Sequence, residues 1–294
     1  MARIFVLYTG GTFGGVQTSR GISPLPVAEL AGLLPSVAAD VCIEGFERIL
    51  DSSGIEPADW VDIAQVVAKN YEQFDGFVIL HGTDTMAYTS SALSHLFEGL
   101  AKPVVLTGSQ VPLSFPQNDA EQNYRDAVRF AGSGPPGIWV VFGGLEIRGD
   151  RAVKVSCERW QAFSAPKGDS DRGVDPRPFR ALSRIEPDVR LLFCHPGLTA
   201  AKLAEEILRP AKGLVIASYG VGNLPDDPIV EQALATAISE HGKRIVQVTQ
   251  CAHGAVDAGV YAAGGSMVRT GVQAGGNLTI EAAITGLMVD LARV

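Results

Sequence analysis

Cysteine is scarce in this 294-residue sequence, and none of it forms a short paired motif. No Cys-X-X-Cys element occurs among the four residues of this type, Cys42, Cys157, Cys194 and Cys251. A chain of this length buries enough apolar surface to fold without disulfides or a structural metal. His195 and His253 lie near two of the cysteines, but such neighbours at strand ends are more often packing and turn residues than zinc ligands. We therefore expect reduced thiols, a cytoplasmic location and no metal.

Long apolar runs and an excess of basic charge are also missing. No hydrophobic stretch approaches the roughly 20 residues of a membrane-spanning helix. The first apolar stretch covers only Ile4 to Tyr8, which is too short for a secretory signal. The sequence has 24 Lys and Arg against 32 Asp and Glu, a net charge of −8. This balance argues against a nucleic-acid surface, so we expect neither nucleic acid nor a membrane as a partner.

Several widespread catalytic and cofactor motifs are absent. There is no Gly-X4-Gly-Lys-Ser/Thr phosphate loop, no Gly-X-Ser-X-Gly nucleophile elbow and no His-Glu-X-X-His zinc motif. Gly220-Val221-Gly222 begins like a dinucleotide fingerprint, but Pro225 stands where a third glycine is needed. These absences disfavour nucleotide enzymes, α/β-hydrolases and zinc proteases, and we expect no cofactor.

Glycine, in contrast, is abundant, and short apolar runs alternate with helical patterns. The proportion of glycine, 33 of 294 residues, exceeds the roughly 7% of an average protein. Helices are expected from Asp227-Pro228 to Gly242 and from about Thr85 to Glu98. The alternation predicts an α/β fold with helices on both faces of a mostly parallel sheet. The predicted strands are Ile4–Tyr8, Gly76–Leu80, Pro103–Thr107, Gly137–Phe142, Arg190–Cys194, Gly213–Ser218 and Arg244–Thr249.

The segment Ser164–Pro187 interrupts this alternation. It combines four prolines with a charged run and has almost no periodicity, which is typical of a linker or an exposed loop. We predict a larger N-terminal α/β domain over residues 1–185, with the linker at about 164–187. A smaller C-terminal α/β domain is expected over residues 188–294.

Three predicted strands of the first domain end in the same chemistry. They run into Thr9-Gly10-Gly11-Thr12, into His81-Gly82-Thr83-Asp84-Thr85, and into Thr107-Gly108-Ser109-Gln110. Ligands of open parallel sheets bind outside the carboxyl ends of the strands, and glycine lets backbone N–H groups approach them. One such turn is ordinarily a strand-to-helix connection with an N-cap. Three turns alike predict a ligand site.

Threonine is the candidate reactive group at these strand ends. Its hydroxyl is a poor nucleophile unless a base takes its proton, and a lysine can serve as that base. Asp84 directly follows Thr83, so a lysine near both would complete a Thr–Lys–Asp relay. Lys154 is the candidate, although its spacing alone is more typical of an exposed loop lysine.

The segments Thr9–Thr12, His81–Met86 and Thr107–Leu113, in this order, resemble the signatures of the bacterial-type L-asparaginase family, its cytoplasmic type I in particular. Leu50-Asp51-Ser52-Ser53 resembles the substrate loop of that family. The likeness extends into the second domain at Ser218–Asn223 and Val248–Cys251, so it covers essentially the whole chain.

This resemblance implies a flavodoxin-like parallel-sheet N-terminal domain, a smaller α/β C-terminal domain, and a homodimer or homotetramer. By the same resemblance, Thr12 would attack the side-chain amide carbon of L-asparagine. Thr83, Asp84 and Lys154 would relay the proton and activate water, and backbone N–H groups near Thr83 would face the oxyanion. Ser52 and Asp84 would hold the α-carboxylate and α-ammonium of the substrate. The remaining residues expected to bind substrate are Gly11, Ser53 and Gly82.

One position departs from the family pattern. The family carries a tyrosine on the mobile segment after Thr-Gly-Gly-Thr, whereas Ile22 stands there within residues 13–24, and no tyrosine occurs between Tyr8 and Tyr71. A catalytically weak or regulatory protein that binds asparagine or aspartate is therefore the alternative to an active amidohydrolase. A glutamine-amide-hydrolysing subunit of a tRNA amidotransferase is a third hypothesis, which the acidic charge balance disfavours.

Overall fold

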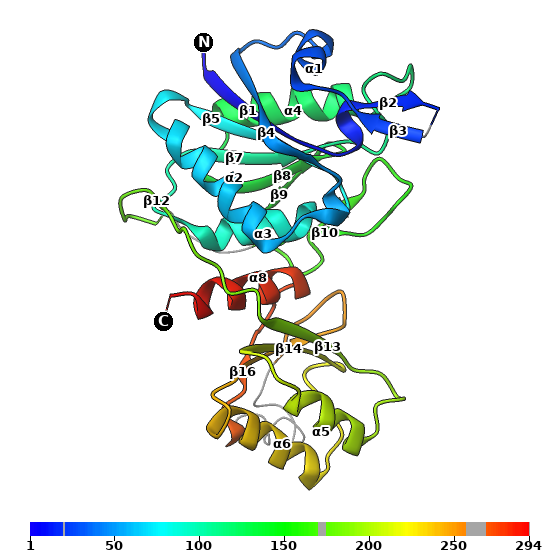
Figure 1. The fold of residues 1–294 in the computed structure, drawn as a ribbon, viewed down its shortest axis with the longest axis vertical. Helices are drawn as coiled ribbons and strands as arrows, with labels where there is room; N and C mark the ends of the chain where they lie inside the picture. Colours follow the sequence, from blue (N-terminus) through cyan, green and yellow to red (C-terminus); the bar gives the residue numbers. More distant parts are fainter. Residues whose placement is uncertain (20, 170–174, 257–268, 294) are drawn as a thin grey trace. The chain divides into compact units, whose positions relative to one another are not determined.

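The computed structural model describes residues 1–19, 21–169, 175–256 and 269–293. They form two compact units, Met1–Ser183 and Arg184–Val294, which Figure 1 traces by colour along the chain. Arg20 of the segment 13–24 and residues 170–174 of the expected linker lie outside the described residues. None of the helices in the described ranges is long and apolar enough to cross a membrane.

A six-stranded sheet forms the centre of the first unit. Its strand order is β4-β1-β5-β7-β8-β9, with five parallel strands and β9 antiparallel at one edge. This order is the flavodoxin-like one, so the predicted fold class is confirmed, and it reverses between β1 and β5, where ligands of such sheets bind. The strands are β1 (Arg3–Gly10), β4 (Asp40–Leu50), β5 (Gly76–Leu80), β7 (Pro103–Thr107), β8 (Gly137–Phe142) and β9 (Leu145–Arg148).

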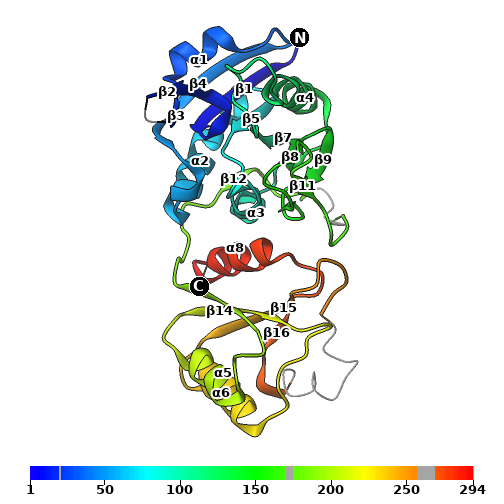
Figure 2. The same ribbon diagram turned by 90° about the vertical axis from the view of Figure 1, so that its right-hand side faces the viewer.

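Helices cover both faces of this sheet, as Figure 2 shows for α4 and α3. Alternate residues of β1, Ile4, Val6 and Tyr8, share one buried cluster with Leu30 and Tyr124 of the helices on that face. Period-two alternation of a strand therefore divides the core between two helical layers. The helices are α1 (Val27–Leu33) and α4 (Ala120–Ser133) on this face, with α2 (Pro57–Asn70) and α3 (Met86–Leu96) on the other.

Short elements complete the first unit around the strand ends. The β2–β3 hairpin follows β1 directly, with Gly15 paired to Pro24 and Gln17 paired to Ile22. The further antiparallel pairs are β10 with β11 and β12 with β6. The bounds are β2 (Gly15–Thr18), β3 (Gly21–Pro24), β6 (Phe97–Glu98), β10 (Val153–Lys154), β11 (Phe163–Ser164), β12 (Arg180–Ala181), and the 3-10 helices η1 (Thr12–Gly14), η2 (Ser52–Gly54) and η3 (Tyr71–Gln73).

The second unit is a parallel four-stranded sheet in the order β13-β14-β15-β16. Helix α8 packs on one face, and α5 and α6 pack on the other. Thr199, Asp227 and Thr279 begin the three helices, because each side chain accepts a hydrogen bond from a backbone N–H of the first turn. The elements are β13 (Val189–Phe193), β14 (Gly213–Ser218), β15 (Arg244–Thr249), β16 (Gln273–Ala274), α5 (Ala200–Leu208), α6 (Pro228–Ser239) and α8 (Ile280–Leu291).

The predicted strands are confirmed, with small changes at the ends of β1 and β13. The helix predicted over Thr85–Glu98 is wrong at its end, because Phe97 and Glu98 leave the helix and pair with Arg180–Ala181. Strand β4 has no counterpart among the predicted strands. Its sequence alternates apolar and polar residues, as an edge strand does, instead of forming a continuous apolar run.

Tyr8 carries a hydroxyl that the fold leaves unpaired. The side chain is fully buried, and its Oη has no hydrogen-bond partner among the described residues. A Cβ on Gly14 would lie 2.3 Å from this oxygen, so the backbone of η1 packs directly against the phenol. Burial raises the pKa of Tyr8 from 10.0 to about 12.

Tyr8→Phe should therefore raise the free energy of unfolding by about 1 kcal/mol, because it keeps the ring and removes an unsatisfied buried hydroxyl. As the pH rises above 10, the unfolded chain loses the phenol proton first, so this group's contribution to stability is lost between pH 10 and 12. Urea denaturation should show that the free energy of unfolding falls less between pH 8 and pH 11 for Tyr8→Phe than for wild type. Tyr8→Leu, which removes the ring, is the control and should be less stable than wild type. A Tyr8→Phe variant no more stable than wild type would contradict an unsatisfied phenol at this position.

Candidate active site

A cavity of about 380 Å³ lies at the carboxyl ends of β1 and β5. Every residue that the sequence analysis named as catalytic or substrate-binding lines this cavity, except Ser53. Ser53 is exposed, and its backbone N–H donates to Asp51 at 3.1 Å. The further lining residues, none of which the sequence analysis named as catalytic or substrate-binding, are Ile22, Pro24, Leu50, Asp51, Gln110 and Cys157.

The strand ends meet here because glycine allows their backbones to touch. A Cβ on Gly11 would lie 2.4 Å from the Cα of Gly82, and one on Gly82 would lie 2.4 Å from the Ser52 Oγ. A Cβ on Gly108 would lie 2.2 Å from the His81 carbonyl oxygen. Side chains at these positions would separate the loops, so the glycines are what bring the three threonine-containing turns together.

Thr12 begins η1, directly after Gly11, whose φ of 79° is in the left-handed region. The turn is closed by the backbone N–H of Gly15, which donates to the Thr12 carbonyl. Within the described ranges, the Thr12 hydroxyl has no hydrogen-bond partner, and the side chain is half-buried at the cavity. It is therefore accessible to a ligand.

Lys154 joins Thr83 and Asp84 across 70 residues of sequence. Its Nζ lies 2.8 Å from Thr83 Oγ1 and 2.6 Å from Asp84 Oδ1. The β10–β11 pairing, which opposes Lys154 to Phe163, holds the lysine in place. The Lys154 side chain is 18% exposed and that of Asp84 is 63% exposed, so the amine is shielded while the carboxylate faces the solvent side. One lysine therefore contacts both of the groups for which the sequence analysis sought a partner lysine.

Gln110 closes the cavity beside Thr83. Its backbone N–H donates to both carboxylate oxygens of buried Asp119, at 3.1 and 2.9 Å. Its side-chain amide nitrogen faces the carbonyl of Arg159 at 3.3 Å, and its Oε1 faces Thr83 Oγ1 at 3.5 Å. The signal was visible in the sequence, because Gln110 is the last residue of the third glycine-containing turn, but nothing there tied it to Thr83.

The segment after β1 forms an ordered hairpin whose base is fixed. Leu113 donates its backbone N–H to the Phe13 carbonyl, and Ser114 Oγ donates to the Gly15 carbonyl. Ile22, on β3, lines the cavity with a side chain that is 52% exposed. A Cβ on Gly15 would lie 2.5 Å from Ile22 Cγ2 and 2.9 Å from the Thr12 carbonyl oxygen. An apolar side chain therefore stands beside the turn that carries Thr12.

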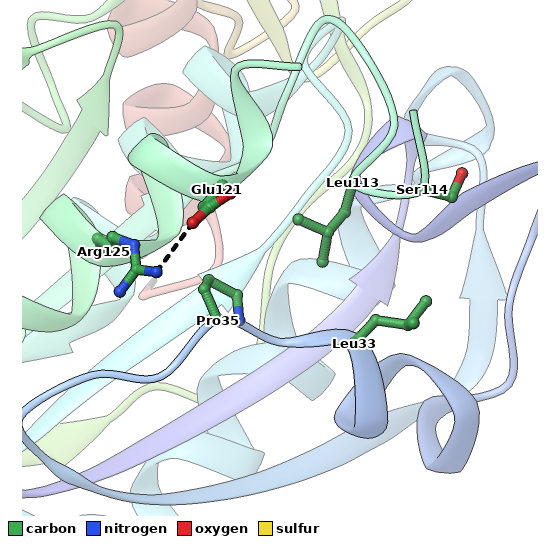
Figure 3. A pocket seen from close by; sticks show the side chains of 6 residues that line it. All are labelled: Leu33, Pro35, Leu113, Ser114, Glu121 and Arg125. Carbon is green, nitrogen blue, oxygen red and sulfur yellow. Dashed lines mark hydrogen bonds and ion pairs between the residues drawn. The ribbon is translucent and has the colours of Figure 1, made fainter. Parts of the chain in front are cut away.

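A second cavity, of about 470 Å³, lies between the end of α1, the loop before α4, and α4 itself (Figure 3). Its charged groups are Glu121 and Arg125, which pair with each other at 2.8 Å. The other lining side chains are those of Leu33, Pro35, Leu113 and Ser114. No nucleophile–base pair lies here, so the cavity at Thr12 is the candidate active site.

A metal-dependent reaction has no ligand set in the parts of the chain that the structure describes, where no group of three or more His, Cys, Asp or Glu side chains is placed to hold an ion. Of the residues considered for zinc, Cys194 is buried, and its burial raises the thiol pKa to about 11. Cys251 and His253 are exposed.

Comparison with known proteins matches both units to one family. Residues 3–171 match the model "Asparaginase, N-terminal", and residues 188–293 match "Glutaminase/Asparaginase C-terminal domain". The chain belongs to the asparaginase family. It is 35% identical to L-asparaginase 1 of Escherichia coli over 97% of this chain and 90% of that protein. The asparaginase family membership identifies the chain as an amidohydrolase.

A solved structure and a differently named relative extend the comparison. The asparaginase from Thermococcus kodakarensis superimposes with a TM-score of 0.90 at 32% identity, covering 99% of this chain and 93% of that one. The human 60 kDa lysophospholipase is 35% identical over 99% of this chain but only 58% of its own length. The asparaginase architecture therefore recurs under more than one name.

Cys157 offers a direct test of this cavity. It is exposed and lines the cavity together with Lys154 and Asp84. Alkylation with N-ethylmaleimide should lower amidase activity at least tenfold, because the added group fills space beside Lys154. After the same treatment, Cys157→Ser should keep most of its untreated activity, although Cys42 and Cys251 are also exposed. Equal inactivation of both proteins would contradict the placement of Cys157.

Proposed function

We propose that this protein hydrolyses L-asparagine to L-aspartate and ammonia, with Thr12 as the nucleophile. The observation that supports this most strongly is the contact of one lysine with both Thr83 and Asp84 in a cavity that Thr12 lines. A threonine, a lysine and a carboxylate are the groups that nucleophilic amide hydrolysis needs when no metal takes part.

In the first half-reaction, Thr12 Oγ attacks the side-chain carbonyl carbon of the substrate. The C–O bond to Thr12 forms, the C–N bond breaks, and the hydroxyl proton passes to the leaving nitrogen, which departs as ammonia. The accessible hydroxyl of Thr12 suits this role. The product is an acyl-enzyme ester on Thr12.

In the second half-reaction, a water attacks that ester. Thr83, Lys154 and Asp84 form the hydrogen-bonded relay that carries a proton from this water to Thr12 Oγ. Attack breaks the bond to Thr12, restores its hydroxyl and releases aspartate.

The substrate backbone is held by Ser52 and Asp84 in this proposal. Asp84 uses one carboxylate oxygen for Lys154, which leaves the other for an α-ammonium group. Ser52 is buried against Gly82, so its hydroxyl is close to the backbone of the turn and suits an α-carboxylate. Ser53 does not line the cavity and takes no part, while Gly11 and Gly82 allow close approach.

The alternative, a weak or regulatory asparagine- or aspartate-binding protein, rests on Ile22. An isoleucine cannot donate a hydrogen bond to a nucleophilic hydroxyl. Against this alternative, Thr12, Thr83, Asp84 and Lys154 are all present and assembled. We therefore propose an active hydrolase that acts in the cytoplasm as a homodimer or homotetramer, an assembly that light scattering on the purified protein would test.

Replacement of the hydroxyls tests the two half-reactions. Thr12→Ala and Thr83→Ala should each lower ammonia release from L-asparagine by about 10³-fold or more, because each removes a group for which the site has no substitute. Thr12→Ser and Thr83→Ser, which keep a hydroxyl, should retain measurable activity. Ammonia release is measured on L-asparagine, L-glutamine and their D-isomers. Wild-type activity no higher than that of the alanine variants on every amide would reject the proposal.

Ile22→Tyr tests the missing tyrosine. If a phenol at this position polarises Thr12, the variant should raise kcat by about tenfold, which is less than the roughly 10²–10⁴-fold that one general acid or base contributes. Ile22→Phe is the matched control, because it adds the ring without the hydroxyl. Calorimetric titration of wild type with L-aspartate separates slow chemistry from weak binding. The same kcat in the tyrosine and phenylalanine variants would reject this role for position 22.

A further inference from the structure

The structure contains a chain of hydrogen bonds behind the cavity. Trp60 Nε1 donates to Thr89 Oγ1 at 3.1 Å, and Thr89 Oγ1 lies 3.0 Å from His81 Nε2. His81 Nδ1 in turn lies 2.6 Å from the carbonyl oxygen of Gly82. His81 and Thr89 are fully buried, so solvent does not compete for these groups.

The partners of the ring fix its protonation state. A carbonyl oxygen only accepts, so His81 Nδ1 carries the hydrogen. Burial lowers the pKa of His81 to about 4, so the ring is neutral at pH 7 and Nε2 carries no hydrogen. The Thr89 hydroxyl accepts from Trp60 and gives its one hydrogen to that nitrogen. The ring is therefore the neutral Nδ1–H tautomer.

This chain determines which way the peptide between Gly82 and Thr83 points. The peptide is trans, so its C=O and N–H are directed oppositely. With the Gly82 oxygen held on the buried side by His81, the Thr83 N–H is directed away from the imidazole. Gly82 and Thr83 line the cavity, and no acceptor among the described residues takes the Thr83 N–H. That backbone donor is left for a ligand.

We propose that His81, held by Thr89 and Trp60, is a positioning residue that aims the Thr83 backbone N–H at the oxyanion of the reacting amide. This inference rests on the proposed function and adds a group outside the cavity to it. His81 does not line the cavity and both ring nitrogens are engaged, so it moves no proton in the reaction. Its role is to keep a donor preorganised where charge develops.

Thr89→Val is the decisive variant, because valine keeps the shape and removes the hydroxyl. It should lower kcat for L-asparagine at least tenfold and change KM less than threefold, since an oxyanion donor acts mainly in the transition state. Thr285→Val is the matched control. Thr285 is a buried threonine as well, and its hydroxyl donates to the Glu281 backbone carbonyl at 2.9 Å. It lies on α8 of the second unit, so its variant should keep wild-type kcat.

Nitrogen-15 NMR of the histidines at pH 7 is the second readout. Wild-type His81 should be the neutral Nδ1–H tautomer, and Thr89→Val should show a mixture with the Nε2–H form. If Thr89→Val does not fold, Trp60→Phe, which removes the indole N–H and keeps an aromatic ring, should lower kcat in the same direction.

The outcomes separate this inference from the proposed function. An unchanged kcat in an active, folded Thr89→Val protein, or an Nε2–H or charged His81 in wild type, would overturn the role of His81 alone. Wild-type protein without ammonia release on any amide would overturn the proposed function, and the role of His81 with it.

Discussion

The site depends on the contact of three backbones that have no room for side chains. Gly11, Gly82 and Gly108 pack so closely against neighbouring turns that a Cβ at any of them would lie within 2.4 Å of another atom. Parallel strands alone would place these turns along one sheet edge, but several ångströms apart. The contact of the glycine turns brings Thr12 and Thr83 to one cavity. The chemistry of the site therefore follows from a steric constraint on the backbone.

Two kinds of polar interaction have different roles in the site. The hydrogen bonds that run from Trp60 through Thr89 to His81 join neutral, buried groups. They orient the Gly82 carbonyl at little electrostatic cost. The Lys154–Asp84 pair is charged, and its carboxylate is largely exposed. A pair with one exposed partner contributes little to stability, so the proposed chemistry explains its place in the fold better than folding energy does. In the proposed function, the buried neutral groups orient the site and the Lys154–Asp84 pair takes part in the reaction.

Much of the fold could be read from the sequence, because buried parallel strands are continuous apolar runs that end in recognisable turns. Strand β4 could not, because an edge strand carries polar residues on one face. In the site, the glycine turns were visible locally. Lys154 needed the family resemblance, because its place is set by pairing with β11, which no local pattern reveals. The cavity also includes Gln110, which was not named as a site residue, and leaves out Ser53, which was, because cavity lining depends on how separate loops meet.

The β2–β3 hairpin places an apolar side chain, that of Ile22, beside Thr12. Its base is fixed by the loop before α4, so Ile22 is held beside the turn of Thr12. A half-exposed isoleucine gains by contact with a bound ligand and can exclude water from it. It cannot share the proton of a hydroxyl. In the proposed function, the groups left for proton transfer are therefore Thr83, Asp84 and the shielded Lys154 amine that contacts both.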